Sequence, residues 1–187
     1  MCKKKISSKD EYKRTPFDAD VELTGSEKQI AWAKDIIKEK IEILNNVMEA
    51  EGMPEDPKEF DRQRFKSNRV WYDPVDLGSS GDMPQEIFPE GFFKEAVLTE
   101  KEGVKYLSKK FPNDIDPKTG EKPTELRGYS YKALLALNVY EARKISDAVK
   151  KYKVEIQKNI KAQKSAKWWI ERREQQYWTG VDWGDKK

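Results

Sequence analysis

The chain has 187 residues, enough for one folded core with an appendage, and 38% of them are Asp, Glu, Lys or Arg. It contains no histidine and a single cysteine, Cys2. These counts exclude a histidine general base, a Ser-His-Asp triad, a zinc site of Cys and His ligands, and a disulfide framework. We therefore expect a protein that binds a partner, with no catalytic residues, no metal and no cofactor.

The polar composition does not indicate a disordered chain, because 11% of the residues are aromatic and six of those are tryptophans. The mean hydropathy is −0.96. No stretch approaches the roughly 20 apolar residues that span a bilayer, and the lysines near the N-terminus precede no apolar run. The sequence therefore predicts a cytoplasmic protein with no membrane partner.

Residues 1–22 have the polar composition of a flexible arm, and 23–187 read as one helical domain. The first helix is predicted to begin near Thr24, which can cap it, with Glu27 three residues later as in a capping box. Apolar residues then follow helical spacing in two stripes up to a stop signal at 52–54. The first stripe comprises Ile30, Ala33, Ile37, Ile41, Leu44 and Met48, and the second Trp32, Ile36, Ile43 and Val47. Two stripes indicate a helix that is covered on more than one side.

A Pro-rich insert is expected over 53–128. Within it, residues 58–66 have the pattern of a short helix, and 69–72 that of a short strand. Thr99 and Glu102 form a second capping box, which opens a helix to about Phe111.

The last helical segment begins near Ser130 and keeps helical spacing to Gln163. As one continuous helix it would be roughly 50 Å long, against roughly 40 Å for the first. Ser165 is expected to separate it from a final aromatic helix over 166–178. The predicted fold is mainly α: a long antiparallel helix pair with an irregular Pro-rich insert and, at most, a short strand pair.

The last helical region carries the strongest charge asymmetry. Residues 141–175 contain eleven Lys or Arg and five Asp or Glu, a net of +6 within a chain of +3. Arg143, Lys150 and Lys161 nearly eclipse one another on a helical wheel, opposite the apolar face. Such a row could follow a phosphate backbone, or it could be a solvated outer face. In the first case, reversing Lys150, Lys158 and Lys161 to Glu should abolish binding and leave the fold intact.

Aromatic and arginine residues alternate in the C-terminal stretch. Aromatic rings beside arginines stack on nucleobases or form the anchors of protein interfaces, and they also serve as plain packing. The candidate binding residues for a partner or nucleic acid are Arg143, Lys150, Lys151, Lys158, Lys161, Lys164, Arg172, Arg173, Trp178 and Trp183.

Acidic residues make poor metal-site candidates in this sequence. Asp114, Asp116 and Glu125 match three positions of a calcium-loop frame, but Lys118 occupies another and the glycine is displaced. Asp18, Asp20 and Glu22 could neutralise a basic surface or lie in solvent.

Two stretches resemble a known group. Leu23-Thr24-Gly25-Ser26-Glu27-Lys28-Gln29-Ile30-Ala31-Trp32-Ala33 and Ala166-Lys167-Trp168-Trp169-Ile170-Glu171-Arg172-Arg173 are similar to paired segments in small proteins of Gram-positive gut bacteria, their phages and mobile elements. Glu171-Arg172 replaces the Asp-Asn pair usual there. The pairing implies that the two stretches touch, with Trp32 against Trp168 and Trp169.

The resemblance implies an accessory or anti-defence function. We expect a non-enzymatic binding protein that inhibits a nucleic-acid-processing complex, such as a CRISPR nuclease with its Cas effector and guide RNA. Direct binding of single- or double-stranded nucleic acid is the alternative, and a metal-dependent nuclease is a third. The sequence leaves the oligomeric state open.

Overall fold

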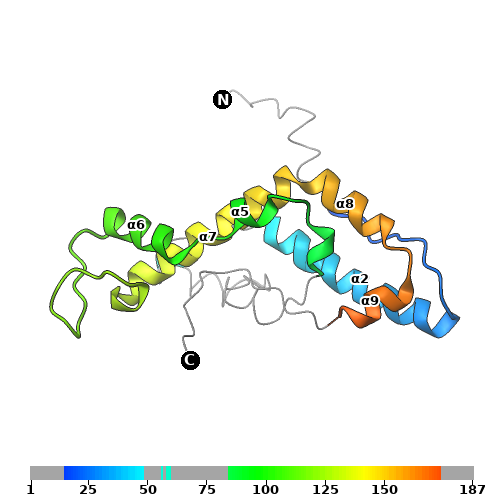
Figure 1. Ribbon diagram of the computed structural model, residues 1–187, viewed down its shortest axis with the longest axis horizontal. Coiled ribbons are helices and arrows are strands. Elements are labelled where there is room, and N and C mark those ends of the chain that lie inside the picture. Colours follow the sequence, from blue (N-terminus) through cyan, green and yellow to red (C-terminus); the bar gives the residue numbers. More distant parts are fainter. Residues whose placement is uncertain (1–14, 49–55, 57, 60–83, 174–187) are drawn as a thin grey trace, which may run out of the picture.

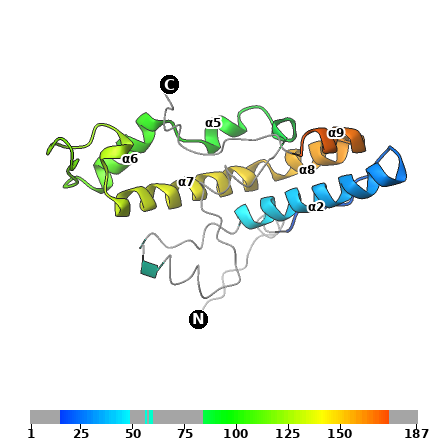
Figure 2. The ribbon, with the colours of Figure 1, turned by 90° about the horizontal axis from the view of Figure 1, so that it is seen from below.

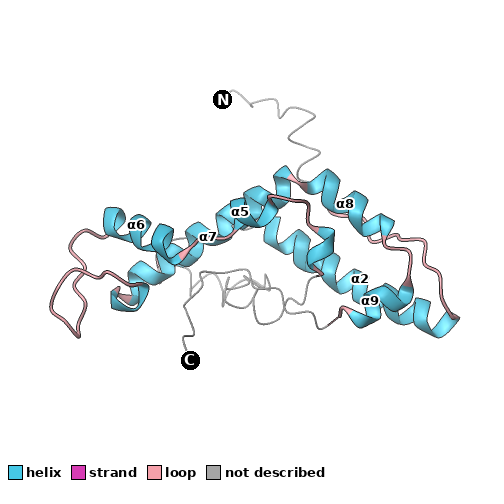
Figure 3. Ribbon diagram, in the orientation of Figure 1, coloured by secondary structure: helices cyan, strands magenta, loops and turns pink. Residues whose placement is uncertain are grey.

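The computed structural model describes residues 15–48, 56, 58–59 and 84–173. Within these ranges the protein is mainly helical, as predicted, and the only β-type pairing is an isolated bridge between Thr24 and Ser165 (Figure 3). The strand predicted at 69–72 and most of the helix predicted at 58–66 lie outside them. No helix among the described residues has both the length and the apolar character needed to cross a membrane.

Helix α2, Glu27–Met48, is covered on two sides, as its two apolar stripes predict. Ala33, Ile37 and Ile41 of the first stripe are buried, and so are Ile36 and Ile43 of the second. The exception is Trp32, which is 48% exposed. Burial of both stripes requires neighbours on two faces of the helix. These neighbours are residues 131–151 and 166–171 of the C-terminal half, together with residues 15–22, which precede the helix.

The capping box predicted at Thr24 and Glu27 is wrong. Ser26, not Thr24, caps the helix: its Oγ accepts from the N–H of Gln29, and its own N–H donates to Gln29 Oε1 at 3.0 Å. Thr24 instead bonds through its backbone to Lys164 and Ala166. Between Thr24 and this cap, Gly25 has a φ of +151°, a conformation that favours glycine, and a Cβ atom added there would lie 3.2 Å from Ala166 Cβ.

The predicted helix over 130–163 is interrupted once. Helix α7, Tyr131–Lys151, begins at the Ser130 cap, and helix α8, Lys153–Ala162, follows after Tyr152. Tyr152 has φ −95° and ψ 9°, and its phenolic O–H donates to Glu95 Oε1 at 2.8 Å. The bend at this residue divides the described part of the protein into two arms (Figure 1).

Helix α2 runs antiparallel to the α7–α8 unit. At one end the N–H of Thr24 donates to the carbonyl of Lys164 at 2.7 Å, and at the other Ser146 Oγ donates to the carbonyl of Met48 at 3.1 Å. Figure 2 shows α2 beside α8 and the end of α7. The antiparallel helix pair expected from the sequence is therefore present, with a bend in its second member.

The described part of the Pro-rich insert, residues 84–128, is more ordered than an irregular insert. It contains the 3-10 helices η2, Gln85–Ile87, and η3, Leu126–Gly128, with α5, Phe92–Ala96, and α6, Glu100–Lys110, between them. The Thr99–Glu102 capping box opens α6 as predicted. Helix α5 packs on α7 and contributes Phe92 and Ala96 to the main core, which is the cluster of buried apolar side chains shared by α2, the end of α7, α8 and α9. Helix α6 and η3 form a second small core with the start of α7.

Residues 15–22, which we call the strap, were predicted to be part of a flexible arm but are packed against the rest of the protein. Phe17 and Val21 are 4% and 5% exposed, and the N–H of Phe17 donates to Asn45 Oδ1 at 2.7 Å. The strap lies along α2 and α8 because its two apolar side chains join the main core. Residues 1–14 of the expected arm lie outside the described residues.

Helix α9, Ala166–Glu171, begins at the Ser165 cap as predicted and packs on α2. The two stretches that resemble segments of other proteins, 23–33 and 166–173, therefore touch. The expected contact of Trp32 with Trp168 and Trp169 does not make this junction. Trp169 is the buried ring, with its Nε1–H donating to the carbonyl of Gln163 at 2.8 Å. Trp32 lies at the surface, and the two stretches meet instead where Thr24 is hydrogen-bonded to Ala166 and Gly25 lies close to the Ala166 side chain.

This difference separates the stabilities of two tryptophan variants. We expect Trp169→Ala to lower the free energy of unfolding by about 3–5 kcal/mol, as for large core truncations, and Trp32→Ala to lower it by less than about 1 kcal/mol. Urea denaturation of both variants measures this. Equal losses would contradict the observed packing.

Glu141 is a buried carboxyl on α7, only 3% exposed. The backbone of Leu98 hydrogen-bonds to it, while its Oε1 has no hydrogen-bond partner within the described structure. Burial raises the pKa of Glu141 from 4.5 to about 7, against the smaller opposing effects of Leu98 and Lys144. The native state therefore holds this proton more tightly than the unfolded chain does.

Because the pKa of Glu141 is higher in the native state than in the unfolded chain, the protein loses stability as the pH rises. The stabilisation by protonated Glu141 is complete below pH 4.5 and is lost as the pH rises through about 7. The loss is at most about 3.5 kcal/mol, at roughly 1.4 kcal/mol per pKa unit. Glu141→Gln keeps an acceptor for Leu98 and removes the titration. We expect it to flatten the stability profile between pH 4.5 and 8.5 in urea denaturation, and a variant with the wild-type slope would refute the assignment.

Candidate functional site

The candidate basic residues are distributed over the bent unit and its C-terminal extension. Arg143, Lys150 and Lys151 belong to α7, and Lys158 and Lys161 to α8, with Lys164, Arg172 and Arg173 following. Trp178 and Trp183 lie outside the described residues. The break at Tyr152 means that the basic residues of α7 and α8 do not form the single straight row that a continuous helix would give.

One lysine of this region is not on the outer face at all. Lys153, which lies in the sequence between the basic residues of α7 and those of α8, is 4% exposed. Its Nζ donates to the carbonyl of Thr15 and lies 5.6 Å from the Phe17 ring centroid. Burial lowers the pKa of Lys153.

Several candidate cations form ion pairs with the protein's own carboxylates. Lys161 Nζ lies 2.5 Å from Asp18 Oδ2, and Lys164 Nζ 3.5 Å from Glu22 Oε2. Two other pairs involve the insert: Lys151 with Glu95 at 2.6 Å and Arg172 with Glu86 at 2.7 Å. The strap and the insert thus place acidic side chains along a surface that the sequence alone shows as basic.

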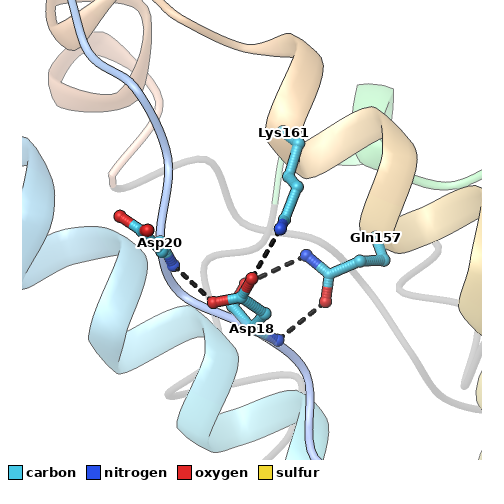
Figure 4. Close-up of polar contacts among 4 residues, drawn as sticks. All are labelled: Asp18, Asp20, Gln157 and Lys161. Atoms are coloured by element: carbon cyan, nitrogen blue, oxygen red, sulfur yellow. Dashed lines mark hydrogen bonds and ion pairs between the residues drawn. The ribbon is translucent and has the colours of Figure 1, made fainter.

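The Asp18 contact is the most elaborate of these pairs (Figure 4). The Asp18 carboxylate accepts from Lys161 and from the backbone N–H of Asp20, and both contacts lower its pKa. The backbone of Asp18 is bound by Gln157, whose Oε1 accepts from its N–H at 2.7 Å and whose Nε2 donates to its carbonyl at 2.9 Å. The same Asp18 carboxylate raises the pKa of Lys161.

Glu95 holds the bend in a similar way. Both of its oxygens accept from Lys151 Nζ, and Oε1 also accepts from Tyr152. Donation from Lys151, followed by that from Tyr152, lowers the pKa of Glu95. Glu86 and Glu95 carried no signal in the sequence, because their partners are 86 and 56 residues away.

A different kind of surface lies where α9 meets α2. Arg173 stacks on Trp32 at 4.9 Å from its ring centroid, and Arg172 stacks on Trp168 at 4.6 Å. We call these four residues the tryptophan–arginine cluster. Trp32 is 48% exposed, and both guanidinium groups lie within cation–π distance of the rings. Tryptophan and arginine are the residues that most often anchor protein interfaces.

The acidic residues of the suspected calcium loop have structural roles. Asp114 Oδ2 accepts from the N–H and the Oγ of Ser130, next to the start of α7. Asp116 Oδ1 accepts from the N–H of Lys118 within a turn. Among residues 15–48, 56, 58–59 and 84–173, no three Asp, Glu or Cys side chains converge as a metal site would require.

Comparisons with known proteins give no relative. No family model, no curated protein and no solved structure matches the chain.

The ion pairs change the expected effect of reversing Lys161. This reversal, which we expected to leave the fold intact, places a carboxylate against Asp18. We therefore expect Lys161→Glu to lower the urea midpoint of unfolding, whereas Lys158→Glu, an exposed neighbour on the same helix, should not change it.

A charge swap provides the control. Asp18→Lys added to Lys161→Glu should raise the urea midpoint part of the way back to the wild-type value, because the two variants together recreate a pair of opposite charges at the same contact. If Lys161→Glu and Lys158→Glu unfold at the same urea concentration, the pair does not hold the strap.

Proposed function

We propose that the protein is a non-enzymatic binding protein that inhibits a nucleic-acid-processing complex, and that its partner surface is the tryptophan–arginine cluster. The observation that carries this proposal is an exposed Trp32 with Arg173 stacked on it, beside the Trp168–Arg172 stack. An exposed, pre-oriented aromatic ring loses little conformational entropy when a partner covers it.

The ion pairs support a protein partner over plain phosphate binding. Affinity for a nucleic-acid backbone comes from cations that replace condensed counterions. Lys151, Lys161 and Lys164 already lie against carboxylates of the same chain. A phosphate backbone would have to compete with these carboxylates, and it would be repelled by them.

The identity of the complex rests on the sequence resemblance. The similar helix openings and aromatic C-terminal stretches occur in phage and mobile-element proteins, for which a CRISPR nuclease is a natural target. Direct nucleic-acid binding remains the second candidate, favoured by the net +6 of residues 141–175.

The test compares two exposed aromatic residues at opposite ends of the molecule. Trp32→Ala should raise the concentration needed to inhibit target-DNA cleavage by a guide-loaded CRISPR nuclease by roughly 30-fold or more, as for an interface anchor worth about 2 kcal/mol. Tyr131→Ala is the matched control, because Tyr131 is 69% exposed and lies outside the cluster.

Complex formation and salt dependence decide between the candidates. An inhibitor forms a stable complex with the nuclease on size exclusion, and Trp32→Ala weakens that complex. If the protein inhibits no such nuclease but binds DNA or RNA alone, with affinity that falls steeply with salt, the alternative holds and the proposal is wrong.

A further inference from the structure

The strap is held on α2 and α8 by side chains that recognise its backbone. Asn45 accepts a hydrogen bond from the N–H of Phe17, and Lys153 donates one to the carbonyl of Thr15. Gln157 accepts from the N–H of Asp18 and donates to its carbonyl. Hydrogen bonds to the main chain do not depend on which side chains the bound segment carries. We call Asn45, Lys153, Gln157 and Lys161 the strap seat.

Specificity comes from three side chains of the strap. Phe17 and Val21 are 4% and 5% exposed and pack into the main core, while Asp18 faces Lys161 at 2.5 Å. The seat therefore fits an extended segment with an apolar residue, an acidic residue directly after it, and a second apolar residue three positions further on.

We propose that the strap seat is a peptide-binding site, which the chain's own residues 15–22 occupy and which an extended acidic peptide of the same pattern can occupy in their place. The proposal concerns a surface separate from the tryptophan–arginine cluster, and it stands whether or not that cluster binds a nuclease.

The seat is built for a peptide and not for nucleic acid. Asn45 Oδ1 and Gln157 Oε1 both face backbone N–H groups as hydrogen-bond acceptors. A phosphate group has no hydrogen to donate to them, and it would leave these two acceptors unsatisfied. The buried positions of Phe17 and Val21 likewise require apolar side chains.

The connection between the strap and α2 allows exchange without loss of the helix pair. Thr24 is bonded through its N–H to Lys164 and through its carbonyl to Ala166. These bonds, with the Ser26 cap, fix the start of α2 after the strap ends. Release of residues 15–22 therefore leaves the contact between α2 and α9 in place.

The test uses the full chain and a fluorescent peptide with the sequence of residues 15–24. Because the strap competes at an effective concentration on the order of 1 mM, the wild-type chain should bind this peptide at least roughly tenfold more weakly than a variant with a weakened strap. The weakened variant is Phe17→Ala/Val21→Ala, which leaves the seat intact.

Gln157→Ala in that background should reduce peptide binding at least about tenfold, because it removes two backbone hydrogen bonds. Lys158→Ala is the matched control on the same helix and should leave binding unchanged. Absence of binding by a folded Phe17→Ala/Val21→Ala chain, or binding that survives Gln157→Ala, overturns the proposal. Displacement of the peptide by a single-stranded oligonucleotide would instead assign the seat to polyanions and also overturn it.

A second measurement decides the matter if the double variant does not fold. In the wild-type chain, the amide hydrogens of Phe17 and Asp18 are bonded to the seat. A saturating amount of unlabelled peptide should raise their hydrogen-exchange rates at least about tenfold, while amides of α2 stay protected. Unchanged exchange of Phe17 and Asp18 at millimolar peptide overturns the proposal.

Discussion

Helix α2 has apolar residues on two faces, and the rest of the described structure follows from the need to cover both. Helix α7 covers one part, α9 another, and the strap closes the remaining side with Phe17 and Val21. With 38% of its residues charged and 36% hydrophobic, the chain has few apolar side chains for a thick core. Short helices and the strap cover α2, and the charged side chains of these segments are therefore placed on the surface around it.

The charge pairing is a consequence of this covering. Once Phe17 and Val21 are buried, Asp18 and Glu22 are carried to Lys161 and Lys164. Packing of α5 on α7 likewise brings Glu95 to Lys151 at the bend. These exposed pairs contribute little to stability individually, but they determine how much positive charge the outer face presents to a partner.

Local signals predicted the helices well. Ser130, Ser165 and the Thr99–Glu102 box cap the helices that they were expected to cap, because a cap depends on residues within one turn. The two stripes of α2 likewise predicted its burial on two faces, because helical periodicity is a property of a single segment.

Long-range contacts account for what the sequence could not predict. No proline or glycine occurs between Ser130 and Gln163, so nothing local marked the break at Tyr152, where the tyrosine hydroxyl meets Glu95. The strap looked like a flexible arm because its burial depends on Asn45 and Gln157, far along the chain. Trp32 and Trp169 could not be told apart, because the burial of each ring depends on how α2 and α9 meet, and these helices lie far apart in the sequence.

The protein's own carboxylates pair with two of the candidate lysines, Lys151 of α7 and Lys161 of α8. Lysine acylation at neutral pH, followed site by site by mass spectrometry, tests this pairing most directly, because only the neutral amine reacts. The ion pairs with Glu95 and Asp18 raise the pKa of Lys151 and of Lys161. These two lysines should react more slowly than the exposed Lys158, and high salt should bring their rates closer to that of Lys158. Equal labelling rates for Lys151, Lys158 and Lys161 at low salt would show that the ion pairs do not form.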